Sequence, residues 1–405
     1  MVLGAALALA ALLPGCGSKD RGGRHPDGSL TIYSSLPRAG LSARNADAVA
    51  AGERLALADA GGRAGGRRVR LVELDSSAPG ADTWDPGTVD ANARRAADDP
   101  TAIAYIGELD FGASAISLPI TNSAGLLQVS PADGLTTLTV RDPGLHAEGP
   151  ERYYPHDRRT FIRLVPADYL QAETLVAWAR ADGARSLAIV RDDRLFGREL
   201  GDEAGAAAVR ARIRVTTVTE ARHGQRDYAD VARELATHRA DAVLYTGLGG
   251  ESANRTLAAV QRTLPHARLY GSSGVAAGGI DLDGGPILRT DSVLPGDRYG
   301  RAARRVLDRL RAQRGAPTAA QSLYGYQAMR LVLAALDRAG TESDERAPVV
   351  SAAMRPHALP ATLGRYFLTN TGDVSPARFG AYRQDHARTE LLGLRGPTGP
   401  IAPGR

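Results

Sequence analysis

The chain of 405 residues contains one cysteine, Cys16, and one lysine, Lys19. A single cysteine excludes an internal disulfide and any zinc site built from cysteine pairs. The eight histidines are scattered, and none of them has the His-x-x-x-His or His-Glu-x-x-His spacing of a zinc-binding helix. The sequence therefore predicts neither a metal site nor a bound cofactor.

Enzyme motifs are missing as well. The chain has no Gly-x-Ser-x-Gly nucleophile elbow and no Gly-x-x-x-x-Gly-Lys phosphate loop. The glycine-rich segment 247–250 lacks the lysine and the following Ser or Thr that a phosphate loop needs. We expect no catalytic residues and no enzymatic activity. A hydrolase stays an alternative, which formation of product from a candidate substrate would reveal.

Aromatic residues make up only 5% of the chain, and its positive charge is almost all arginine. The formal net charge is +5, but basic residues are spread along the sequence and interleaved with Asp and Glu. Nucleic-acid binding usually needs a dense basic stripe with aromatic residues between the charges. We therefore expect no nucleic-acid partner.

Long apolar runs are absent after Leu13, so no later segment approaches the ~20 residues of a membrane-spanning helix. Residues 1–13 are mostly Ala, Leu, Val and Gly, and small residues lead from there to Cys16. This arrangement is typical of a secretory signal peptide, although no basic residue precedes Cys16. The alternative is a short buried helix whose cysteine packs as a small hydrophobic residue.

The segment Leu13-Pro14-Gly15-Cys16 resembles the lipobox of bacterial lipoproteins, in which the cysteine becomes the lipidated N-terminus. The resemblance implies a signal peptide with a lipobox over 1–16 and lipidation of Cys16. It also implies an extracytoplasmic protein anchored to the cell membrane through its N-terminal lipid. Glycine and charged residues over 17–28 predict a flexible tether.

Strand-like and helix-like segments alternate along the first part of the chain. Short runs rich in Val, Ile, Leu and Tyr predict strands, and longer alanine-rich segments with helical spacing predict helices. The expected strands are 30–33, 69–74, 103–107 and 126–129, and the expected helices are 46–60, 89–98 and 113–124. Alternation with crossover-length connections predicts an α/β fold with a doubly wound parallel sheet.

The same alternation restarts near residue 161 and predicts a second α/β lobe. The expected strands are 187–190, 213–218, 242–245 and 268–270, with helices at 169–181, 200–212, 228–238, 252–264, 299–314 and 322–339. A hairpin-like return is expected around 371–373, and the Gly- and Pro-rich residues 391–405 are expected to be disordered. Two open sheets on one chain predict a cleft for a small molecule between the lobes.

The order of several short blocks resembles the solute-binding proteins of ABC transporters, in the Leu/Ile/Val-binding (type I periplasmic binding protein) family. The similarity covers roughly residues 28–390, and it depends on the order and spacing of the blocks. The blocks include Gly125-Leu126-Leu127-Gln128-Val129-Ser130-Pro131, Val190-Arg191-Asp192-Asp193-Arg194-Leu195-Phe196-Gly197, Ala240-Asp241-Ala242-Val243-Leu244-Tyr245 and Tyr324-Gly325-Tyr326-Gln327-Ala328.

The resemblance implies two doubly wound parallel-sheet lobes joined by a three-segment hinge. Lobe 1 would comprise 29–165 and 296–370, and lobe 2 would comprise 166–295 together with 371–390 as the hinge return. The chain would cross between lobes near 165–168, 292–296 and 369–375. Closure of the lobes on a solute would present the loaded protein, expected to be a monomer, to an ABC permease in the membrane.

The resemblance also implies which loops touch the solute. They follow the strand-like segments of both lobes, together with one position before the first helix. The implied ligand-binding residues are Asn45, Asp110, Phe111, Gly112, Ala132, Asp133, Gly134, Phe196, Leu248 and Ser273. The open alternatives are that Asp110 and Asp133 cap local turns, that Phe196 packs in a lobe core, and that residues 272–274 form an ordinary turn.

Two of the departures from the family pattern concern the charged groups of the ligand. Gly134 stands where the family carries a hydroxyl for the ligand carboxylate, and Ser272-Ser273 stands where the family carries an acid for the ligand amine. Buried ligand charges need partners. Either Glu108, Asp110 or Asp133 compensates for these losses, or the solute is not a standard branched-chain amino acid.

The sequence thus predicts an exported binding protein that captures a small polar solute, an amino acid or an amide-like compound, for an ABC permease. The alternative function is ligand sensing through a receptor or regulatory partner.

Overall fold

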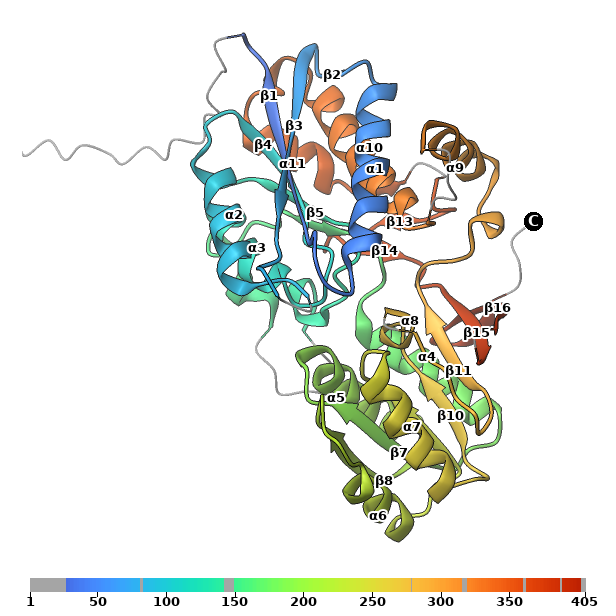
Figure 1. Ribbon diagram of the computed structural model, residues 1–405. Helices are drawn as coiled ribbons and strands as arrows, with labels where there is room; N and C mark the ends of the chain where they lie inside the picture. The colour runs from blue at the N-terminus through green and yellow to red at the C-terminus, as the bar shows by residue number, and fades with distance from the viewer. Residues whose placement is uncertain are drawn as a thin grey trace, which may run out of the picture.

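The computed structural model describes residues 27–80, 83–141, 149–277, 279–314, 319–359, 362–386 and 388–401. These residues form two α/β lobes, one drawn in blue, cyan and orange and the other in green and yellow (Figure 1). The expected signal peptide, Cys16 and most of the expected tether lie outside the described residues. Within the described part of the chain, no helix combines the length and the apolar composition that crossing a membrane requires.

Lobe 1 is built on a six-stranded sheet with the order β2-β3-β1-β4-β5-β6. Strands β1, β3, β4, β5 and β6 are parallel, and the two-residue β2 pairs antiparallel with β3. The strands span Leu30–Leu36 (β1), Arg63–Ala64 (β2), Arg67–Asp75 (β3), Ala102–Ile106 (β4), Leu127–Ser130 (β5) and Phe161–Arg163 (β6).

Helices cover both faces of this sheet, because its central strands are apolar on both sides. Helices α1, α9, α10 and α11 enclose the larger core on one face, and α2 and α3 lie over the other face. The helices span Ala43–Asp59 (α1), Pro86–Asp98 (α2), Ser114–Ser123 (α3), Arg301–Arg314 (α9), Ser322–Ala339 (α10) and Arg346–Met354 (α11).

Lobe 2 is built on an eight-stranded sheet with the order β17-β16-β15-β11-β10-β9-β7-β8. The strands from β7 to β11 are parallel, and β15, β16 and β17 extend the sheet in antiparallel fashion. The strands span Ser186–Asp192 (β7), Arg214–Ala221 (β8), Ala242–Tyr245 (β9), Arg268–Gly271 (β10), Ile287–Asp291 (β11), Phe379–Asp385 (β15), Arg388–Gly396 (β16) and Gly399–Ile401 (β17).

Two helices lie over each face of the lobe 2 sheet. Helices α4 and α5 share one core, and α6 and α7 share the other. A short helix, α8, follows β10. The helices span Asp168–Ala181 (α4), Leu195–Arg210 (α5), Ala229–Thr237 (α6), Glu251–Thr263 (α7) and Gly274–Ala277 (α8).

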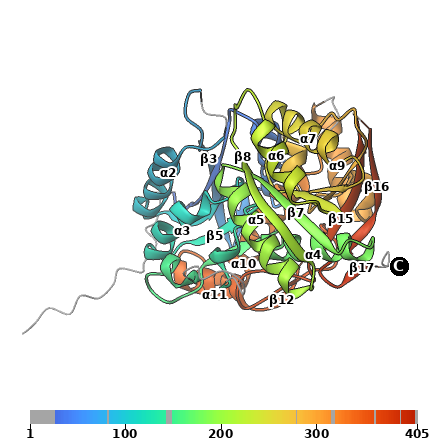
Figure 2. The ribbon, with the colours of Figure 1, turned by 90° about the horizontal axis from the view of Figure 1, so that it is seen from below.

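The structure corrects the expectation of a disordered tail over 391–401, whereas 402–405 lie outside the described residues. Residues 391–396 continue β16, which pairs with β15, and 399–401 form β17. The Arg395 guanidinium stacks on the Trp178 ring of α4 at 4.4 Å from the ring centre, and β17 lies beside α4 (Figure 2). The Gly and Pro content of this segment reflects its turn rather than disorder.

Three connections join the lobes: β6 to α4, β11 to α9, and a small sheet to β15. The small sheet contains β12 (His357–Ala358), β13 (Phe367–Leu368) and β14 (Val374–Ser375). The hairpin expected around 371–373 is the β13–β14 turn. The Val374 side chain is buried in the lobe 1 core, so the third crossing begins after Ser375. This is a few residues later than the sequence suggested.

Helices α1 and α10 pack unusually closely through two glycines. A Cβ atom added to Gly325 would overlap the Val49 carbonyl of α1, and one added to Gly52 would overlap the Ser322 carbonyl of α10. Both obstacles are backbone atoms, which cannot rotate away. The position of α1 relative to α10 therefore depends on the absence of side chains at these two sites.

We predict that Gly325→Ala lowers the free energy of unfolding by roughly 1–3 kcal/mol, the usual cost of overpacking a core. The matched control is Gly205→Ala in α5, where an added Cβ would lie 3.8 Å from Ile189 Cδ1, an ordinary contact. This control should be neutral or stabilising, because alanine favours a helix more than glycine does. Thermal unfolding of both variants checks the prediction. Equal effects of the two substitutions would contradict it.

Candidate ligand-binding cleft

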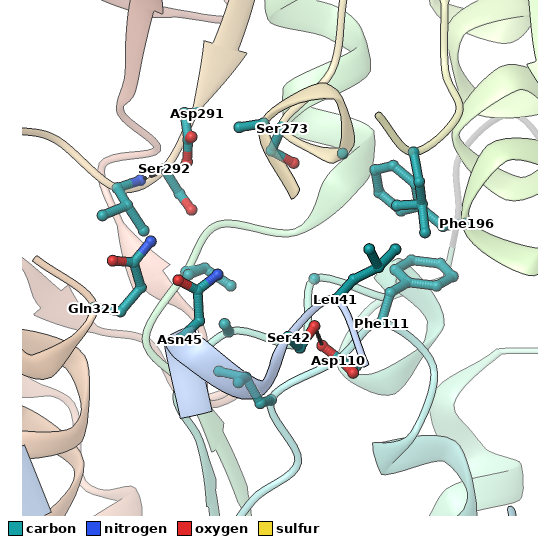
Figure 3. Close-up of a pocket in the computed structure, with 18 of the residues that line it drawn as sticks. Leu41, Ser42, Asn45, Asp110, Phe111, Phe196, Ser273, Asp291, Ser292 and Gln321 are labelled. Atoms are coloured by element: carbon teal, nitrogen blue, oxygen red, sulfur yellow. Dashed lines mark hydrogen bonds between the residues drawn. The ribbon is translucent and has the colours of Figure 1, made fainter. Parts of the chain in front are cut away.

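A cavity of about 710 Å³ lies between the lobes. Both lobes line it, and so do residues within or next to all three connections, namely Val165 and Pro166, Asp291 to Val293, and Phe379. Figure 3 shows its polar and aromatic side chains converging on a common space. Such a volume is typical of small-molecule sites, and the position of the cavity makes its shape depend on the angle between the lobes.

The lobe 1 wall consists of the loop before α1, the first turn of α1 and the loop that follows β4. The Ser42 hydroxyl donates a hydrogen bond of 2.5 Å to Asp110 Oδ1. The other carboxylate oxygen of Asp110 is buried and has no hydrogen-bond partner among the described residues. Burial raises the pKa of Asp110 to about 6, and the neighbouring Asp133 carboxylate raises it further against the opposing Ser42 hydrogen bond.

Asp133 and Gly112 do not line the cavity, although the sequence placed them there. The buried Asp133 carboxylate accepts hydrogen bonds from the backbone N–H groups of Gly112, Ser114 and Leu135. It therefore holds two loops in place beneath the cavity floor, as the turn-capping alternative proposed. Gly112 has a φ of +78°, which disfavours other residues, and an added Cβ would lie 2.8 Å from Leu195 Cδ2.

Gly134 lies in the wall, and the carboxylate of Asp168 occupies the space beside it. A Cβ at position 134 would lie 2.5 Å from Asp168 Oδ1 and 2.6 Å from Oδ2. The Asp168 amide donates to the Gly134 carbonyl at 2.9 Å, which fixes the start of α4 against this loop. Burial raises the pKa of Asp168 to about 7, with Arg163 opposing the shift and Asp133 adding to it.

The lobe 2 wall is less polar. Phe196, at the start of α5, forms an edge-to-face pair with Phe111 of lobe 1, at 5.2 Å between ring centres. This pair joins the two lobes across the cavity (Figure 3). Phe196 also belongs to the lobe 2 core, so the core-packing alternative and the wall position both hold. The Ser273 hydroxyl donates to Gln171 Oε1 at 3.2 Å.

The opposite end of the cavity is polar. Asn45, Asp291, Ser292 and Gln321 lie together there, away from the two phenylalanines (Figure 3). The Asp291 carboxylate is already paired, because Arg289 Nη1 lies 3.1 Å from its Oδ2 and the Val293 amide donates to its Oδ1. The amide and hydroxyl groups of the other three residues can both donate and accept hydrogen bonds.

Eight of the ten candidate residues from the sequence line the cavity. They are Asn45, Asp110, Phe111, Ala132, Gly134, Phe196, Leu248 and Ser273. Sequence reasoning missed Leu41, Ser42, Asp168, Gln171, Asp291, Ser292 and Gln321. Asp168 and Ser292 could have been found, because they fall in the expected lobe crossings at 165–168 and 292–296. Within the part of the chain that the structure describes, no group of His, Cys, Asp and Glu residues could hold a metal ion.

Comparison with known proteins identifies the family. The model of a family described as "Periplasmic binding protein" matches residues 31–378. The chain belongs to this family. The Leu/Ile/Val-binding protein BraC3 of Rhizobium johnstonii is 24% identical over 287 residues, which are 67% of this chain and 70% of that protein.

Two solved structures illustrate the shared fold. The leucine-binding protein LivK of Thermotoga maritima has a TM-score of 0.73 at 19% identity, over 91% of this chain and 99% of that chain. A solute-binding protein of an ABC transporter from R. palustris, solved with benzoate, has a TM-score of 0.71 at 17% identity. The match covers 93% of this chain and 98% of the R. palustris chain. At these identities the likeness concerns the fold, which is the expected type I periplasmic binding protein fold.

The buried Asp168 carboxyl predicts a specific pH dependence of the stability of the ligand-free protein. Its pKa is higher in the folded state than in the unfolded state, so the folded state binds more protons between about pH 4 and pH 7. This stabilising contribution is lost as the pH rises through about 7. Asp168→Asn should therefore unfold at a higher temperature than the original protein above pH 7, with the difference vanishing towards pH 4. A constant difference across this range would contradict the assignment.

Proposed function

We propose that this periplasmic binding protein captures a small polar solute, an amino acid or an amide-like compound, between its lobes and delivers it to an ABC permease. The observation that supports the proposal is the cavity lined by both lobes and by residues within or next to all three connections. A solute that touches both walls stabilises the closed arrangement, and closure excludes water from the solute. A permease could then distinguish loaded from empty protein by the angle between the lobes.

The proposed activity is binding without turnover. Membership of a family of binding proteins supports binding without turnover, as do the relatives named for binding leucine, isoleucine and valine. The polar groups of the cavity wall suit hydrogen bonding to a small solute, and the Phe111–Phe196 pair suits an apolar part of it. A sensing role would use the same cleft, and only the partner that recognises the closed conformation would differ.

We predict that the solute raises the unfolding temperature of residues 20–405 in a screen of amino acids, amines, amides and aromatic acids. At a hundredfold excess over Kd, a ligand that binds only the folded state adds about 2.7 kcal/mol. Ser273→Trp, which places a large side chain in the cavity, should abolish the shift. Val209→Trp is the matched control, since Val209 is exposed on α5 and should leave the shift unchanged. Release of product instead of stoichiometric binding would indicate a hydrolase.

We further propose that the protein is tethered to the membrane by a lipid on Cys16. The sequence Leu13-Pro14-Gly15-Cys16 supports this proposal, together with the Gly-rich, charged segment that follows it. A binding protein held close to its permease delivers solute at a high local concentration.

We predict that Cys16→Ser releases the full-length protein from the membrane fraction into the soluble fraction. Ligand binding should be unchanged, because the described residues that line the cavity begin at Gly40. Fractionation of cells that produce either form, followed by the thermal screen on the released protein, checks both statements. A variant that stays with the membrane would show that the lipobox assignment is wrong.

A further inference from the structure

Two carboxylates line the cavity where a hydroxyl group was expected from the family pattern. Asp168 is 8% exposed and lines the cavity beside Gly134, and Asp110 lines the same cavity. Neither Asp168 oxygen accepts a hydrogen bond from a residue that the structure describes. The second oxygen of Asp110 is equally without a partner in the described chain. Two carboxylates with unpaired oxygen atoms therefore line the same cavity, and the part of the cavity that they border forms an acidic subsite.

The cations nearest to this subsite are already engaged. The Arg163 charge opposes the rise in the pKa of Asp168 that burial causes. The Arg163 guanidinium itself, however, donates hydrogen bonds to Asp373 at 2.6 Å and to the Leu135 carbonyl at 2.7 Å. Arg289 binds Asp291. Among the described residues that line the cavity, Arg44 is the only cationic side chain, and it is exposed. When both carboxyls are ionised, above their raised pKa values, the subsite thus carries an excess of negative charge that no side chain of the wall neutralises.

A solute carboxylate would be poorly held in this subsite. The space that a hydroxyl donor on residue 134 would need is filled by the Asp168 carboxylate, at 2.5 Å from the Cβ position. A solute anion would meet like charges there, and placing like charges together in a buried site is costly. A solute cation would instead complete the pairing that buried carboxylates require.

We infer that the subsite between Asp110 and Asp168 receives a positively charged, hydrogen-donating group of the solute, an ammonium or amidinium, in place of a carboxylate. This inference rests on the proposed solute-binding function and specifies its solute class. The apolar part of the solute lies towards Leu41, Phe111 and Phe196. A carboxylate on the same solute would have to lie elsewhere in the cavity, and Arg44 is the available partner.

The pH dependence of binding distinguishes a cation from an anion in this subsite. The charged and titratable groups around it are Asp110, Asp133 and Asp168, with Arg163 behind Asp168 and Arg44 at the cavity wall. Both wall carboxyls have raised pKa values in the empty protein, about 6 and about 7. A cation binds the ionised carboxylates, so its affinity should fall as the pH drops from 8 to 5. An anion would show the opposite dependence.

The test compares compounds that share a carbon skeleton, with binding measured by titration calorimetry at pH 8. One set is leucine, isoamylamine and 4-methylpentanoate, and matched sets on phenylalanine, arginine and glutamine skeletons extend the comparison. We expect an amine or amidine to bind at least tenfold more tightly than its amino acid, and the corresponding acid not to bind. Asp168→Asn should weaken amine binding at least tenfold, whereas Asp308→Asn, at an exposed position of α9, should not change it.

A second variant separates a change of preference from a loss of folding. Asp168→Ala combined with Gly134→Ser removes the acid and places a hydroxyl donor in the vacated space. Preference should shift at least tenfold from the amine towards the amino acid. Tighter binding of a carboxylate to the original protein, or no binding of any amine or amidine, would overturn the inference. The first result would leave the solute-binding function intact, whereas no stabilisation by any compound of the screen would also contradict that function.

Discussion

The arrangement of the cleft depends on one buried ion pair, between Arg163 and Asp373. Arg163 is fully buried at the end of β6, and its Nε lies 2.6 Å from Asp373 Oδ1 in the β13–β14 turn. Its remaining donors bind the Leu135 carbonyl and the Thr139 hydroxyl. The same arginine therefore holds together the strand before the first lobe crossing, the turn before the third crossing and the loop beyond Gly134. Loss of one partner would leave a buried charge uncompensated, which is far more costly than losing an exposed pair.

Several acidic groups lie in or near the loops around the cavity, and two of them are already satisfied within the protein. Asp133 is satisfied by backbone N–H groups and Asp373 by Arg163, so both carboxylates organise loops and neither is free for a ligand. The pKa of Asp373 is lowered, since Arg163 and its other donors outweigh burial. The Arg163 charge opposes the rise in the pKa of Asp168, but Arg163 donates no hydrogen bond to this carboxylate. The structure thus separates carboxylates that hold the scaffold from carboxylates that remain available to a solute.

Much of the fold follows from local sequence patterns, and the limits of prediction have physical causes. Alternating strand and helix signals predicted both parallel sheets, because buried parallel strands are apolar throughout. Strand β16 was missed, since Gly and Pro in its flanking turn resemble a disordered tail and its pairing with β15 is visible only in three dimensions. Asp110 and Asp133 are similar in sequence context, yet one faces the cavity and the other faces backbone N–H groups. Which way a loop carboxylate points depends on tertiary packing.

The relation between Gly134 and Asp168 shows what the sequence could and could not reveal about the site. The glycine was recognisable as a departure from the family pattern, but the residue that fills the space beside it comes from a different element, after the first crossing. The two positions are sterically coupled, because any side chain at 134 would collide with the Asp168 carboxylate. A hydroxyl donor at 134 therefore requires the Asp168 side chain to leave the position that it occupies here. Whether this wall presents a donor or a carboxylate to its solute is therefore decided jointly by the residue at 134 and the side-chain position of residue 168.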